Sequence, residues 1–197
     1  MFWRLLAEKG LPAARAYAAI APSVPHALHM PSHIFSRAGL WREMVASNQA
    51  SYQAAKGELK EASLGVGAYD ALHAMDYMVF AHLQQAQDKA AKRLVEEAGA
   101  IRKLNVENFP AAYAFAAIPS RYALERSDWK GAAALELLPA ELAWDKFPQA
   151  EAILVFARGL GAARSGLQAA LAREPIPRQQ FSVRYPTRLR MAGKSAE

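Results

Sequence analysis

The chain has 197 residues, 53% of them hydrophobic and 21% charged, which suits one domain with a continuous core or several small stacked units. It contains no cysteine, so disulfides, a thiolate nucleophile and metal sites built on thiolates are excluded. The N-terminal residues are charged too early for a signal peptide, and no stretch approaches the ~18 uncharged apolar residues of a membrane span. We therefore expect a cytoplasmic protein without a membrane partner.

The formal charge of +6 is concentrated near the C-terminus. Residues 173–197 hold six basic and two acidic residues, a net charge of +4, together with prolines and no helical periodicity. This composition predicts a disordered basic tail over residues 173–197. Because the rest of the chain is nearly neutral, the charge does not favour nucleic acid as a partner.

Hydrophobic periodicity predicts helices throughout residues 1–172. We expect two short helices on either side of Gly10-Leu11-Pro12, and a stop at Pro22-Ser23-Val24-Pro25 because each proline lacks an amide hydrogen. A first helical hairpin follows over about residues 31–55 and turns at Gly39-Leu40-Trp41. The glycines of residues 56–67 predict a longer connection.

Three further hairpins are predicted over about residues 69–104, 109–139 and 147–172. The turn positions Gly39, Ala86, Ser127 and Gly166 are separated by 47, 41 and 39 residues, and Phe-Pro recurs at 109 and 147. Such a period is typical of stacked helix pairs, each too small to bury its apolar face without a neighbour. The sequence thus predicts one all-α repeat domain over residues 1–172.

Small and aromatic residues recur around these turns in the order of the tetratricopeptide repeat family, which the chain resembles. They are Phe35, Gly39, Trp41 and Ala50, then Ala86, Ala91 and Ala98, then Ser127, Trp129 and Ala132. More narrowly, H-A-L-H-M-P-S-H-I-F, G-L-W and D-A-L-H-A-M-D-Y-M-V-F-A-H-L-Q-Q resemble a group of bacterial tetratricopeptide-type proteins of unassigned activity. The resemblance implies a right-handed, tetratricopeptide-like helical-hairpin solenoid whose concave face takes a peptide or partner helix.

The same resemblance implies a further histidine-containing helical segment upstream, so we expect the chain to be an incomplete member of that group. Its C-terminal end also has no amphipathic helix to cap the array. An uncapped end would leave an apolar face exposed. Homo-oligomerisation is one way in which that face would be covered.

Histidines and an aspartate mark the first two hairpins. His29 and His33 are four residues apart, so on a helix they would share a face and could chelate zinc. Pro31 opposes this geometry, because it is expected to push its predecessor out of the helical region. His73 and Asp76 share a face of the next hairpin, and stacking would bring them towards His29 or His33. The alternative is structural, with these polar groups satisfied at a helix interface.

Arginines and aromatic residues predict a partner groove, with Arg37, Trp41, Tyr77, Arg121 and Tyr122 as its candidates. Aromatic residues would bury a partner's apolar side chains, and arginines would hold its carboxylates. The leading hypothesis is a non-catalytic protein-protein interaction scaffold that binds a protein or peptide and needs no cofactor. The alternative is a histidine-based metal-binding or hydrolytic site between the first two hairpins, with zinc as its metal.

Overall fold

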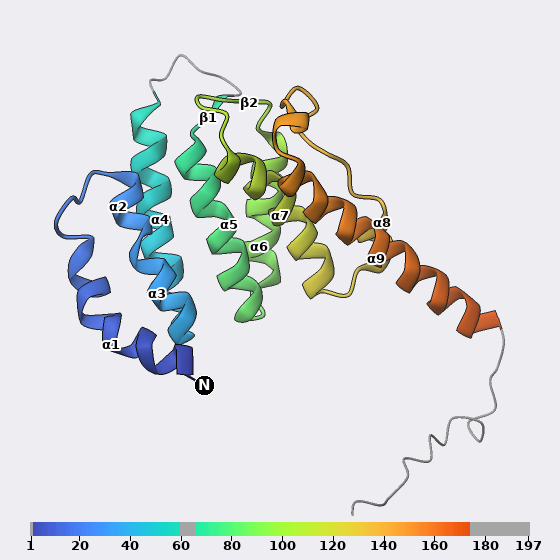
Figure 1. The fold of residues 1–197 in the computed structure, drawn as a ribbon, viewed down its shortest axis with the longest axis horizontal. Coiled ribbons are helices and arrows are strands. Elements are labelled where there is room, and N and C mark those ends of the chain that lie inside the picture. Colours follow the sequence, from blue (N-terminus) through green and yellow to red (C-terminus); the bar gives the residue numbers. More distant parts are fainter. Residues whose placement is uncertain (1, 60–65, 174–197) are drawn as a thin grey trace, which may run out of the picture.

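The described part of the chain is almost entirely helical (Figure 1). The computed structural model describes the backbone of residues 2–59 and 66–173 and the side chains within residues 6–59 and 66–169. The all-α prediction is confirmed for these residues, and the predicted tail lies outside them apart from Arg173. The helices are α1 (Phe2–Tyr17), α2 (Pro25–His29), α3 (Pro31–Ala38), α4 (Trp41–Glu58), α5 (Tyr69–Gln84), α6 (Asp88–Ala100), α7 (Phe109–Glu125), α8 (Trp129–Ala133), the 3-10 helix η1 (Trp144–Lys146) and α9 (Pro148–Arg173).

Successive helices lie side by side across the molecule, from α1 at one end to α9 at the other (Figure 1). Helix α1 packs on α3, α4 packs on α2, α3 and α5, and α5 packs on α7, which in turn packs on α9. The strands β1 (Val66–Gly67) and β2 (Lys103–Leu104) form a parallel bridge. The periodicity predicts a helix up to Leu104, whereas α6 ends at Ala100 and the chain extends to form this bridge.

Three of the four predicted turn positions hold residues in the left-handed backbone region. Gly39, Ala86 and Ser127 have φ angles of 74°, 55° and 56°, and they follow α3, α5 and α7. A positive φ just past a helix lets the chain reverse, and it favours glycine because a side chain crowds the backbone there. These turns lie where the sequence predicts them.

Two prolines interrupt helices less than the sequence predicts. Helix α1 runs as one helix through Pro12, instead of two short ones, and it packs along α3. Met30 has φ −52° and ψ −39°, which is α-helical although Pro31 follows it. The predicted displacement of Met30 is therefore wrong. Burial of His29 and Phe35 on either side offsets the local steric bias, so α2 and α3 run on with one residue between them.

The second helix of the hairpin predicted over residues 109–139 is shorter than expected, because α8 stops at Ala133. Residues 134–147 form an irregular segment that includes η1 and a cis Leu138–Pro139 bond. Trp144 is buried, and its indole Nε1 donates a hydrogen bond to the Pro139 carbonyl oxygen at 3.0 Å. The chain is irregular here, and apolar side chains such as Trp144 pack in the core.

The fourth hairpin predicted over residues 147–172 is wrong, because α9 is a single helix from Pro148 to Arg173. Gly166, the predicted turn, lies exposed within it. Beyond Gly161 the described side chains are exposed except for the half-buried Ser165, and the helix projects from the body (Figure 1). The buried positions of α9 are spaced at helical intervals and are Ala150, Leu154, Ala157 and Gly161.

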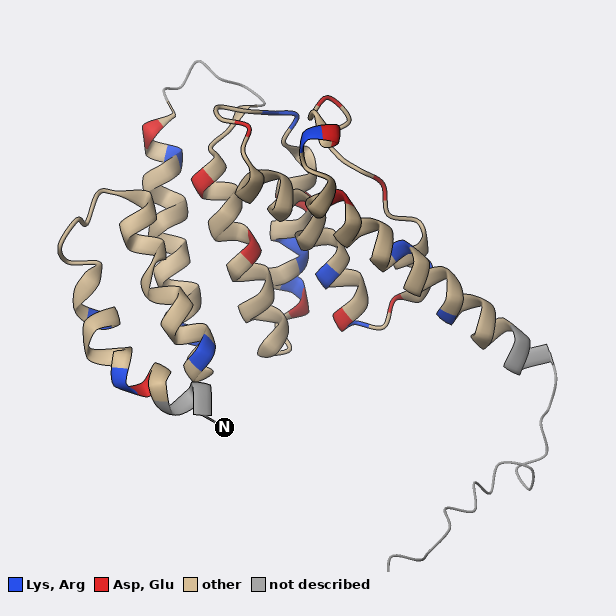
Figure 2. Cartoon of the chain, in the orientation of Figure 1, with Lys and Arg blue, Asp and Glu red and all other residues tan. Residues whose placement is uncertain are grey.

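Two clusters of buried apolar side chains form the core. The larger extends from Tyr52 on α4 to Leu154 on α9, and the smaller includes Phe35 and Met44. Lys and Arg are interspersed with Asp and Glu along the described helices (Figure 2), as is usual for helix faces in water. None of the described helices is long and apolar enough to cross a membrane.

Candidate functional site

A cavity of about 690 Å³ lies between the first two hairpins and α7. This volume is within the ~300–1,000 Å³ usual for ligand pockets. Helices α3, α4, α5 and α7 all contribute side chains, so residues far apart in the sequence meet here. Seven of the nine candidate residues line the cavity, namely His33, Arg37, Trp41, His73, Asp76, Tyr77 and Arg121.

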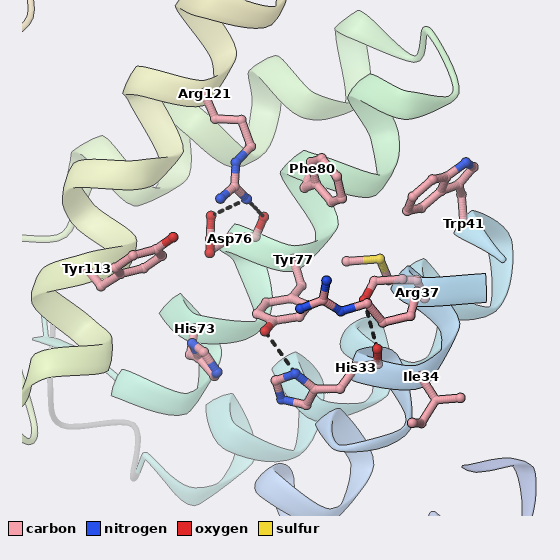
Figure 3. Close-up of a pocket in the computed structure, with 12 residues that line it drawn as sticks. His33, Ile34, Arg37, Trp41, His73, Asp76, Tyr77, Phe80, Tyr113 and Arg121 are labelled. Atoms are coloured by element: carbon pink, nitrogen blue, oxygen red, sulfur yellow. Dashed lines mark hydrogen bonds and ion pairs between the residues drawn. The ribbon is translucent and has the colours of Figure 1, made fainter. Parts of the chain in front are cut away.

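The cavity has an apolar end and a polar end (Figure 3). At the apolar end the rings of Trp41 and Phe80 meet edge to face, with their centroids 5.5 Å apart, and Ile34 is a further apolar side chain of the lining. At the polar end lie His73 and the phenol of Tyr113. The cavity could therefore hold a ligand that is apolar at one end and polar at the other.

A chain of hydrogen bonds runs from the cavity wall into the core. Nδ2 of Asn48 donates to the Met44 carbonyl oxygen at 2.8 Å, so Oδ1 of Asn48 accepts from Nδ1 of His29 at 2.7 Å. Nε2 of a neutral His29 then carries no proton and accepts from Nε2 of His33 at 3.1 Å. Nδ1 of His33 accepts from the Tyr77 hydroxyl at 3.1 Å. The Asn48 amide thus determines the tautomers of both histidines.

His29, His33 and His73 all favour their neutral forms. Burial, reinforced by the nearby His73, lowers the pKa of His29 to about 3. Burial and the neighbouring His33 lower the pKa of His73 to about 4. Burial also lowers the pKa of His33. Near neutral pH these rings therefore present lone pairs rather than positive charges.

Asp76 and Arg121 form a buried ion pair in the cavity wall. Nη1 of Arg121 donates to Oδ1 of Asp76 at 2.8 Å, and the Asp76 side chain is 2% exposed. Burial raises the pKa of Asp76 to about 6, while Arg121 acts in the opposite direction. Asp76 thus lines the same cavity as His33 and His73, but its described hydrogen bond is to Arg121 (Figure 3).

Arg37 is the cationic group that the cavity leaves available. It is exposed on α3, and it has no hydrogen bond or ion pair with any residue that the structure describes. Its guanidinium lies in front of the Tyr77 ring, between the two ends of the cavity (Figure 3). An anionic group entering the cavity could bind Arg37 without displacing a protein carboxylate.

Two of the nine candidates lie outside the cavity lining. His29 is buried behind it, with its ring centroid 4.8 Å from that of His33 and 4.4 Å from that of His73. Tyr122 packs on the larger core cluster, and the Arg126 guanidinium lies over its ring at 5.1 Å. Tyr122 is therefore not part of this groove.

The sequence does not single out Asn48, Phe80 or Tyr113 as site residues. A signal for Asn48 exists, since a polar residue on the apolar stripe of a helix needs a buried partner. Phe80 follows Asp76 and Tyr77 at spacings of four and three, so it shares their helix face. Tyr113 has no such signal, because its place depends on how α7 packs on α5.

Within the part of the chain that the structure describes, no group of three or more His, Cys, Asp or Glu side chains is arranged to hold a metal ion. His29 and His33 form a pair with their Nε2 atoms facing, and His73 lies beside His29. No protein-family model, curated protein or solved structure matches the chain. A proposal of function for this chain therefore rests on the residues of the site.

Proposed function

We propose that the protein is a non-catalytic peptide-binding module that holds a carboxylate and an adjacent apolar side chain of its partner in this cavity. The observation that carries the proposal is Arg37, a cation without a protein partner among the described residues, beside a cavity of about 690 Å³. A charge-assisted hydrogen bond from Arg37 would hold the carboxylate. Trp41 and Phe80 would bury the apolar side chain.

The charges around the cavity favour an anion over a cation. Arg121 is already neutralised by Asp76, and the histidines favour their neutral forms. Arg37 is then the charge that a ligand meets. The volume suits a short peptide segment rather than a whole helix, so the partner would enter by one or two residues.

The proposal includes a tetratricopeptide-like architecture of stacked helical hairpins forming a solenoid. The side-by-side packing of successive helices and the left-handed turns at Gly39, Ala86 and Ser127 support it. Such arrays present surfaces to peptides, which fits a scaffold in the bacterial cytoplasm. A second copy of the chain is a further candidate partner.

Isothermal titration calorimetry with two forms of one peptide tests the function. The probe is a six-residue glycine-serine peptide ending in phenylalanine, as the free acid and as the C-terminal amide. We expect the free acid to bind about 10-fold to 100-fold more tightly, the range for one charge-assisted hydrogen bond. Arg37→Ala should remove that preference, and Trp41→Ala should weaken both forms.

Arg42→Ala is the matched control, because Arg42 is also an exposed arginine but does not line the cavity. It should bind both peptides as the wild type does. Equal affinity of the wild type for the acid and the amide would reject the proposal, and so would a preference that survives Arg37→Ala.

A further inference from the structure

The geometry points to a second site at the wall of the cavity: we propose that His29 and His33 bind a divalent transition-metal ion of the zinc class through their two Nε2 atoms. These atoms lie 3.1 Å apart on consecutive turns of nearly continuous helix. Two nitrogen ligands at ~2.0–2.1 Å from a tetrahedral zinc ion are roughly 3.3–3.4 Å apart. The pair therefore needs to open by a few tenths of an ångström, and both rings need to turn so that each Nε2 points at the metal instead of at the other ring.

Each histidine has an oxygen acceptor for the nitrogen that faces away from the metal. Nδ1 of His29 donates to Oδ1 of Asn48 at 2.7 Å. Nδ1 of His33 lies 3.1 Å from the Tyr77 hydroxyl. Metal-binding histidines almost always donate their second N–H to such an oxygen, which orients the ring and makes it a better ligand. The two outer partners are thus already in place.

Binding needs a tautomer change at one residue. Without metal, the proton between the rings is on Nε2 of His33, and the Tyr77 hydroxyl donates to Nδ1. With metal, that proton moves to Nδ1 of His33 and is donated to the Tyr77 oxygen, whose own hydrogen turns away. Both Nε2 lone pairs then face the metal, and no covalent bond other than N–H changes.

His73 is a further imidazole close to the pair. Its ring centroid lies 4.4 Å from that of His29, and its Nδ1 is buried with no hydrogen-bond partner in the described residues. A buried nitrogen without a partner is costly and calls for a ligand. His73 is not at coordinating distance as it stands, so its ring would have to turn to become the third ligand. The remaining positions would take water.

All-nitrogen donors determine the class of metal. Imidazole suits zinc, copper, nickel and iron, whereas calcium and magnesium prefer oxygen ligands. The metal site borders the proposed peptide site, because His33 lines the cavity whereas His29 lies behind it, and Arg37 is not one of its ligands. Metal binding without peptide therefore tests it independently.

The test is calorimetric titration of the untagged full chain with zinc chloride, with magnesium chloride as the comparison ion. We expect one zinc per chain and no magnesium binding. His33→Ala should weaken zinc binding at least 10-fold, and Asn48→Ala about 10-fold to 100-fold because the metal ligand loses its outer partner. His82→Ala is the matched control, since His82 bonds to Gln87 and lies outside the cluster.

His29 is 1% exposed, so His29→Ala could fail to fold. His33→Gln is the second variant, because His33 is half-buried and glutamine keeps a polar side chain there. It should retain the wild-type circular dichroism spectrum and lose zinc affinity. Absence of zinc binding in the wild type overturns the proposal. Unchanged zinc affinity in His33→Ala and His33→Gln does so as well.

Discussion

Asp76 gives the site a defined dependence on pH. Burial raises its pKa from 3.8 to about 6, against the opposing effect of Arg121. The folded protein then binds this proton more tightly than the unfolded chain does, so ionisation of Asp76 lowers stability. The loss is absent below about pH 3.8, grows as the pH rises, and is complete above about pH 6. At 1.36 kcal/mol per pKa unit, a shift of roughly two units corresponds to about 3 kcal/mol.

Asp76→Asn removes the effect of this ionisation on stability, because asparagine stays neutral and its side-chain oxygen can still accept the hydrogen bond from Arg121. We expect the free energy of unfolding of the variant, minus that of the wild type, to rise by about 2.4 kcal/mol between pH 4 and pH 7. Urea unfolding at each pH measures it. Asp145→Asn, which changes an exposed aspartate, is the control and should show no such rise. A constant or falling difference for Asp76→Asn would mean that Arg121 outweighs burial, and would refute the reasoning.

The turns and the α8–α9 contact give further predictions, each measured as the free energy of unfolding in urea. Gly39→Ala should destabilise by about 1 kcal/mol, from backbone conformation alone, since no atom lies within 4 Å of the added Cβ. Ala86→Gly and Ser127→Gly should stabilise by about 0.5–1 kcal/mol, and a loss in both would contradict the left-handed assignment. Gly161→Ala should destabilise by about 1–3 kcal/mol, because its Cβ would lie 2.5 Å from the Ala133 amide nitrogen. Gly159→Ala, which meets nothing within 4 Å, should instead stabilise slightly, and equal effects at the two glycines would argue against the close contact.

The sequence predicts the first three turns because each has a local cause. The apolar periodicity of one helix ends just before Gly39, Ala86 or Ser127, and that of the next helix begins just after it. The few residues between the two helices are polar or include glycine. The prediction at Gly166 rests on the repeat interval instead. Leu167 and the residues after it are good helix formers, so nothing local ends α9 there.

The local rule for the residue before a proline predicts the candidate site poorly. The steric bias before Pro31 argues against a shared face for His29 and His33, yet Met30 is helical and the two Nε2 atoms meet. Burial of the neighbouring side chains in the tertiary structure offsets the steric bias at Met30, and a single sequence does not reveal that burial. Likewise, the pairing of Asp76 with Arg121 joins residues 45 apart, so it depends on how α5 packs against α7.

Helix α9 contains two regions of different local stability. Up to Gly161 its inner face is buried, whereas beyond it the described side chains are exposed apart from the half-buried Ser165. A helical segment shorter than ~12–15 residues is marginal in water without packing. Amide hydrogen exchange should therefore be slow near Leu154 and Ala157 and fast around Gln168, with the opening free energy falling towards zero along one continuous helix. Partner binding to the outer half would appear as new protection there, without a change in the protection of the core.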